Sequence, residues 1–168
     1  MEKFTVEKTK FDNVLVLTPR VFSDDRGYFC ETYNSLGLSN LNFNVDFVQD
    51  NESKSKKNVI RGLHYQWAPA MGKLVRVISG AVIDVVVDIR AKSPTYGEHM
   101  KFEITSENKK QIWVPAGFAH GILSLQEDTL VSYKCSAFYN HEGEGGIDPF
   151  DEDLNIDWGI NSKDAKVS

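Results

Sequence analysis

Short apolar runs separated by turn residues extend through most of this chain, and they constrain its fold more than any other feature. The densest run spans residues 73–90, where valines and isoleucines flank Ser79-Gly80 and predict two strands that meet at a tight turn. Similar strand-like runs occupy residues 14–17, 26–33, 45–49, 99–105, 111–114, 120–125 and 129–137. About ten short, regularly spaced strands with little helix signal predict an all-β protein, an antiparallel sandwich or barrel.

Length and charge limit what such a fold can do. At 168 residues, 41% of them hydrophobic, the chain has enough sequence for one sizeable core, so we expect a single domain over residues 1–168. We expect the acidic, glycine-containing segment 140–168 to wrap the core as loops or short helices, and a helical turn fits within 34–42. A formal net charge of -5 argues against a nucleic-acid partner, because such proteins present a basic field.

The two cysteines and the chain's hydropathy indicate a cytoplasmic protein. Cys30 and Cys135 are far apart and lack the spacing of a zinc or redox motif, so reduced thiols are expected. No apolar run approaches the ~20 residues of a membrane span, so no membrane partner is predicted.

Four histidines are the first candidates for proton transfer, because imidazole titrates near neutral pH. His64 lies in a strand-like run beside Arg61, and His120 follows a Pro-x-Gly turn, whereas His99 and His141 sit among polar residues. The competing interpretation is that His64 and His120 are core histidines with backbone partners.

Other polar residues in the strands have two interpretations each. Tyr133 is either an acid facing a histidine across a pocket or an ordinary strand aromatic, and Lys73 either extends to water or stabilises an oxyanion. Asp84 points either into a cavity or to solvent. The cations Arg26, Arg61 and Lys163 suit a diphosphate, although each alone is equally typical of a protein surface.

Strand parity raises a question about Arg61 and His64. They are three residues apart, so a regular strand would point them to opposite faces. Both reach one pocket only if Gly62 sits at a bulge or if one of them lies at the strand end.

Several ordered blocks of this sequence resemble one known family, the sugar-nucleotide 3,5-epimerases typified by dTDP-4-dehydrorhamnose 3,5-epimerase. The resemblance runs from about residue 11 to about residue 163 and is carried by 25–31, 48–53, 61–66, 73–76, 84–88, 93–97, 117–121 and 133–134. It implies the cupin-type jelly-roll fold with short peripheral helices.

The resemblance also implies a mechanism without a cofactor. His64 would remove a proton alpha to the C4 ketone of dTDP-4-dehydro-6-deoxy-D-glucose, and Tyr133 would return one from the opposite face at C3 and C5, giving dTDP-4-dehydro-L-rhamnose. Lys73 would stabilise the enolate, Asp164 would stand behind His64, and Asp84 would orient His120. The implied role is the supply of activated L-rhamnose or another deoxysugar for a surface polysaccharide.

The residues that match the family's substrate contacts come from many parts of the chain: Arg26, Glu31, Gln49, Asp50, Asn51, Arg61, His120, Glu144 and Lys163. An aromatic such as Tyr139, Phe138 or Tyr28 would stack on the nucleotide's pyrimidine. The family's early strand, here 26–31, is exchanged between subunits. The resemblance therefore implies a homodimer in which Arg26 serves the neighbour's site. Met71 departs from the pattern, since the family often has Gln there.

Three other functions remain open at this stage. A metal-dependent cupin is one, because Pro115-x-Gly117-x-x-His120 resembles a cupin metal motif, but the single His64 is followed by Tyr65 and Gln66 instead of further ligands, so no metal is predicted. The others are a non-catalytic sugar-nucleotide binding module and an enzyme restricted to 3-epimerisation or ketoisomerisation.

Overall fold

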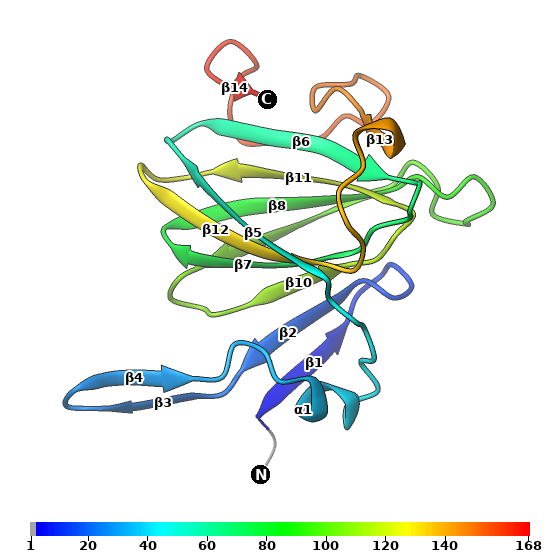
Figure 1. The fold of residues 1–168 in the computed structure, drawn as a ribbon. Coiled ribbons are helices and arrows are strands. Elements are labelled where there is room, and N and C mark those ends of the chain that lie inside the picture. Colours follow the sequence, from blue (N-terminus) through cyan, green and yellow to red (C-terminus); the bar gives the residue numbers. More distant parts are fainter. Residues whose placement is uncertain (1–2) are drawn as a thin grey trace.

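The computed structural model describes residues 3–168 and consists mainly of two facing antiparallel sheets (Figure 1). The first sheet has the strand order β1 (Phe4–Lys8), β2 (Leu15–Pro19), β10 (Gln111–Val114), β7 (Lys73–Ser79), β12 (Thr129–Cys135) and β5 (Gln49–Ser55). The second has the order β13 (Glu144–Gly146), β6 (Val59–Gln66), β11 (Phe118–Ser124), β8 (Ala81–Asp88) and β9 (His99–Thr105). The short β14 (Lys166–Val167) lies parallel to the start of β6. This arrangement is the expected jelly roll.

Helices are short and peripheral, as predicted. They are α1 (Ser35–Ser39) and the 3-10 turn η1 (His141–Gly143). The Asn34 side chain accepts a hydrogen bond from the Gly37 backbone and so begins α1. None of the helices within residues 3–168 is long and apolar enough to cross a membrane.

A hairpin of β3 (Val21–Asp24) and β4 (Gly27–Cys30) forms a separate two-stranded sheet that extends away from the rest of the molecule (Figure 1). Both strands are exposed along almost their whole length, including the aromatic side chains of Phe22, Tyr28 and Phe29. Lys109 and Arg20 tie it to the rest of the chain: the Lys109 ammonium donates to the Tyr28 hydroxyl at 2.7 Å, and the Arg20 guanidinium lies 5.1 Å from the centroid of the Phe22 ring.

Alternation along the strands divides the apolar residues among three buried clusters. The first lies between the two sheets and includes Val75, Val86 and Val131. The second packs the outer face of the second sheet against the C-terminal segment, with Trp158 buried in it. The third covers the outer face of the first sheet with α1 and the residues after it. The C-terminal segment therefore wraps the core as predicted.

Two details of the predicted strands were wrong. The run 73–90 does form two strands around Ser79-Gly80, but β7 pairs with β10 and β12, while β8 pairs with β9 and β11. The turn thus connects the two sheets and does not close a hairpin. The run 45–49 was also predicted as a strand, but the strand β5 begins at Gln49 and takes in the polar stretch that follows, while Val45 and Phe47 pack beneath α1.

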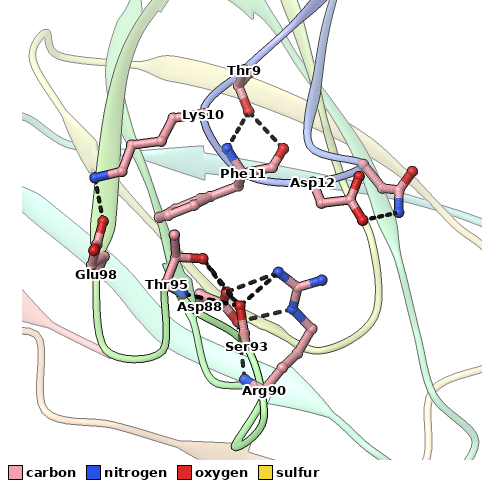
Figure 2. A network of polar contacts seen from close by, with 10 residues as sticks. Thr9, Lys10, Phe11, Asp12, Asp88, Arg90, Ser93, Thr95 and Glu98 are labelled. Carbon is pink, nitrogen blue, oxygen red and sulfur yellow. Dashed lines mark hydrogen bonds and ion pairs between the residues drawn. The ribbon is translucent and has the colours of Figure 1, made fainter.

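A buried carboxylate organises the loop that joins β8 to β9 (Figure 2). Asp88 is fully buried, and its two oxygens accept hydrogen bonds from the Arg90 guanidinium at 2.9 and 2.8 Å. The hydroxyls of Ser93 and Thr95 donate to the same carboxylate, at 2.5 and 2.6 Å. Arg90 also stacks over Phe118, 4.5 Å from the ring centroid. These bonds hold the pKa of Asp88 well below its usual range, with the Arg90 hydrogen bonds as the largest cause.

Asp88→Asn should therefore lower the free energy of unfolding by about 2–4 kcal/mol, because the Arg90 side chain loses its buried partner. Urea unfolding measures the change. The full difference in unfolding free energy should be present above the unfolded carboxyl pKa of about 3.9. It should shrink as the pH falls toward the lower pKa of the folded state, where wild-type Asp88 also becomes protonated. Asp157→Asn removes an exposed carboxylate that lies near Lys101 and should change stability by less than about 0.5 kcal/mol. Equal losses in the two variants would contradict this account.

Candidate active site

A register shift between β6 and β11 decides which side chains of β6 face the space between the sheets. His64 lies opposite His120, but Arg61 lies opposite Ile122, so β6 has one extra residue between the two pairs. Gly62 occupies this bulge with a φ of +125°, and a Cβ there would lie 2.6 Å from the His120 carbonyl oxygen. Because the extra residue shifts the alternation of side chains along β6 by one position, Arg61 and His64 point to the same face of the strand. The bulge expected at Gly62 is thus present.

A cavity of about 200 Å³ lies between the two sheets at this point. Its lining comes from strands of both sheets and from the C-terminal segment: Ser53, Arg61, His64, Lys73, Val75, His120, Ile122, Val131, Tyr133 and Ser168. The cavity thus brings together three of the four residues expected to be catalytic, together with Arg61 and His120.

His64 is half-buried on the wall formed by the second sheet. Burial is the main cause that lowers its pKa, and the neighbouring charges of Lys73 and His120 lower it further. Glu144 and a hydrogen bond to the Ser168 backbone act in the opposite direction. The net effect keeps the imidazole neutral, the form that can accept a proton.

Lys73 and Tyr133 lie on the opposite wall, on β7 and β12. The Lys73 ammonium is 5.7 Å from the centroid of the Tyr133 ring. Burial lowers the pKa of Lys73 and raises that of Tyr133, while the side chain of Asn51 lowers the Tyr133 value. The tyrosine therefore stays protonated at neutral pH and can donate a proton.

His120 completes the wall that contains His64. Its Nε2 atom is 2.8 Å from Oδ2 of Asp84, which is fully buried on β8. Asp84 thus faces the interior instead of solvent. Its Oδ1 atom has no hydrogen-bond partner within residues 3–168.

The strand β5 carries three residues expected to contact the substrate. Asn51 projects inward beside Tyr133, and Gln49 accepts a hydrogen bond from the Tyr139 backbone at 3.0 Å. Asp50 alternates to the other face of the strand, where its carboxylate pairs with the Lys134 ammonium at 2.6 Å. The structure therefore brings Asn51, but not Asp50, toward the cavity.

Arg61 is held in place on the inner wall of the cavity. Its Nε donates to the Ser55 hydroxyl at 2.9 Å, and its guanidinium also donates to the Lys54 carbonyl at 3.1 Å. These bonds fix a cation at the end of the cavity near β5.

Tyr139, on the segment that leads into β13, and Glu144, the first residue of β13, form a pair near the cavity. The Tyr139 hydroxyl donates to the Glu144 carboxylate at 2.8 Å. β13 pairs with β6 so that Gly146 lies opposite His64. Glu144 is close enough to raise the pKa values of His64, Lys73 and Tyr133.

Three other expected site residues lie away from the cavity in this single chain. Arg26 is on the projecting hairpin, paired with Asp24. Glu31 accepts from Lys3 and Asn34. Lys163 is exposed in the turn before β14.

The structure does not support the expected position of Asp164 behind His64. Asp164 is exposed and accepts a hydrogen bond from the Asn161 side chain at 3.4 Å. The cause is the path of the last residues. Lys166 pairs with Val59 at the start of β6, so Asp164 lies beyond that end of the strand, and Ser168 reaches His64 instead.

Sequence reasoning missed two polar residues of the cavity lining, Ser53 and Ser168. Alternation from Asn51 would have found Ser53, which shares its face of β5. No pattern in the sequence marks Ser168. As for a metal, no group of three or more histidine, cysteine or acidic side chains within residues 3–168 is arranged to hold one.

Comparison with known proteins places this chain among epimerases. A family model described as dTDP-4-dehydrorhamnose 3,5-epimerase matches residues 8–168. The chain is 49% identical over 155 residues to the dTDP-4-dehydrorhamnose 3,5-epimerase of Salmonella typhimurium, covering 91% of this chain and 85% of the relative. It is 44% identical over 167 residues to that of Methanothermobacter thermautotrophicus, covering 99% and 90%.

Solved structures agree with this assignment. The Legionella pneumophila enzyme in complex with dTDP-4-keto-L-rhamnose aligns with a TM-score of 0.93 at 40% identity, over 98% of this chain and 88% of that one. The Bacillus anthracis dTDP-4-dehydrorhamnose 3,5-epimerase with TDP and PPi bound aligns with a TM-score of 0.94 at 40% identity, over 98% and 94%. This chain therefore belongs to the dTDP-4-dehydrorhamnose 3,5-epimerase family.

Proposed function

We propose that this protein epimerises dTDP-4-dehydro-6-deoxy-D-glucose at C3 and C5 to dTDP-4-dehydro-L-rhamnose. The observation that carries the proposal is the arrangement of a neutral imidazole and a protonated phenol on opposite walls of one cavity, with a buried ammonium beside the phenol. Family membership and the sugar nucleotide bound to the Legionella pneumophila relative support the same reaction.

The reaction needs only proton transfers. The C4 ketone acidifies the C–H bonds at C3 and C5, and His64 takes one of these protons while the electron pair moves to the ketone oxygen as an enolate. Lys73 stabilises that charge. Tyr133 then gives its hydroxyl proton to the same carbon from the opposite face, so the centre inverts. A second cycle requires that His64 lose its proton and Tyr133 regain one.

The nucleotide is proposed to extend from the cavity toward β5 and the segment before β13. Arg61 provides a fixed cation for the diphosphate. Asn51 and Gln49 provide amides along β5, and the exposed Tyr139 ring provides a surface on which a pyrimidine can stack.

The active form is proposed to be a homodimer with an exchanged hairpin. The projecting β3 and β4 expose Phe22, Tyr28 and Phe29 to solvent in a single chain (Figure 1). Arg26 lies in the turn of this hairpin, outside the lining of its own cavity. An exposed aromatic hairpin is readily accounted for if it packs on a second copy, where Arg26 would serve the neighbour's site.

The acid and base roles predict different outcomes for two variants in deuterated water. His64→Ala should abolish both deuterium incorporation and inversion, by 10²-fold or more, while dTDP affinity changes little. Tyr133→Phe should still exchange the substrate's C–H protons but lose inversion, because only the returning acid is missing. Proton NMR and mass spectrometry count the exchanged carbons, and His99→Gln, on β9 outside the cavity, is the matched control. Full activity in His64→Ala would favour a binding module, and exchange at C3 alone in the wild type would favour a 3-epimerase.

The pKa shifts predict a broad plateau in the pH dependence of kcat/KM. The acid limb should lie below pH 6.5, because His64 must be neutral and its pKa is lowered. The alkaline limb should begin below pH 10.5, where Lys73 loses its proton. Lys73→Arg should move that limb upward, because a guanidinium stays charged. An acid limb above pH 6.5 would contradict the role of His64 as base.

Mixing two inactive variants tests the exchanged hairpin. Arg26→Ala and His64→Ala homodimers should each be nearly inactive. After dissociation and reassociation, a random mixture should recover about a quarter of the wild-type activity, because one site in each heterodimer has both residues intact. If Arg26 served its own chain's site, no activity would return.

A further inference from the structure

Gln66 is a buried polar residue at the end of β6 that the reaction itself does not use. Its side chain makes three hydrogen bonds to two different segments. Nε2 donates to the Pro69 carbonyl at 2.8 Å and to the Phe138 carbonyl at 3.0 Å, while Oε1 accepts from the Asn140 backbone at 2.9 Å. One side chain thus joins the loop after β6 to residues 138–140.

Further contacts extend this junction along residues 138–146, which we call the rim segment. The Asn140 side chain donates to the Ala68 carbonyl at 2.7 Å, and the Trp67 backbone donates to the Gly143 carbonyl at 2.9 Å. The two segments touch so closely that a Cβ on Gly143 would lie 2.0 Å from the Ala68 oxygen. The rim segment is therefore fixed by contacts with β6 and the loop that follows it.

The rim segment carries Tyr139 and Glu144, which are joined by their own hydrogen bond. Glu144 lies opposite Gln66 in the pairing of β13 with β6, and in Figure 1 β13 lies beside the end of β6. Lys73 and Tyr133, in contrast, sit on β7 and β12 in the other sheet. His64 shares β6 with Gln66 and lies opposite Gly146 of the rim segment, but it is also held by its pairing with His120 on β11. A change at Gln66 should thus disturb the rim segment more than the proton-transfer groups.

We propose that Gln66 is a positioning residue that clamps the rim segment and so sets the places of Tyr139 and Glu144 for substrate binding. This inference rests on the proposed function of the cavity. Because the clamp acts on binding and not on proton transfer, its loss should appear in KM and leave kcat nearly unchanged.

The test uses Gln66→Met, which keeps the volume of the side chain and removes all three hydrogen bonds. KM for the 4-keto-6-deoxy sugar nucleotide should rise about tenfold, with kcat within about threefold of wild type. In a Glu144→Gln background, Gln66→Met should raise KM by less than about twofold, because both changes act on one unit. Additive effects on KM, or a fall in kcat alone, would overturn the proposal.

Gln111→Met is the matched control. Gln111 is equally buried and its Nε2 donates to the Thr32 carbonyl at 2.8 Å, but it lies on β10, outside the cavity lining. This variant should leave KM unchanged even if it is less stable. A similar rise in KM in both variants would show that Gln66 has only a structural role.

Amide hydrogen exchange separates the clamp from the reaction. Exchange across residues 138–146 should be faster in Gln66→Met than in wild type, and unchanged there in Gln111→Met. This readout applies even if wild-type protein fails to turn over the substrate, which would refute the proposed function alone. Unchanged protection of the rim segment would refute the clamp. If Gln66→Met does not fold, Asn140→Ala, which loses the bond to Ala68, should show the same faster exchange and raised KM.

Discussion

The bulge at Gly62 is the local feature on which the site depends. A regular strand would place Arg61 and His64 on opposite faces, one in the cavity and one in the second core cluster. The extra residue is accommodated because glycine alone tolerates both the positive φ and the close approach of the His120 carbonyl. The close packing of Gly62 against the His120 carbonyl also holds β11 beside β6. His64 and His120 are therefore cross-strand neighbours on one wall.

The apolar lining of the cavity gives these polar groups their chemistry. Val75, Ile122 and Val131 reduce the access of water, and the resulting desolvation is the largest cause of the shifts at His64, Lys73 and Tyr133. Each shift favours the form of lower charge for that group, so His64 is ready to accept a proton and Tyr133 to give one.

A buried carboxylate balances the cations in this lining. Asp84 leaves one oxygen without a hydrogen bond within residues 3–168, which would be costly in an apolar interior. The nearby Lys73 and His120 offset that cost, since Asp84 raises the pKa of Lys73 and pairs with the His120 ring. The carboxylate therefore helps to keep Lys73 charged despite its burial.

Alternation, which depends on a local period of two residues, was sufficient to predict most of the strands and an antiparallel sandwich or barrel, and the resemblance to the family implied the jelly roll. Alternation was not sufficient to predict which strands pair. Ser79-Gly80 looks like a hairpin turn, yet the chain crosses there between sheets, because the facing sheets together bury both apolar faces. The same limit explains Asp164, whose position depends on where β14 joins β6, a pairing that no local pattern encodes. The single domain and the cytoplasmic location stay predictions.

Two facing sheets suit an inversion better than a single sheet would. Side chains from one strand or one sheet face approach a bound ring from the same side, so they can remove and return a proton only with retention. Here the imidazole comes from β6 and the phenol from β12, in different sheets, and the cavity lies between them. A flat sugar enolate held in that space presents one face to each sheet. The stereochemical outcome would then follow from the architecture of the sandwich, while the identity of the substrate would depend on the less regular segments at its edge.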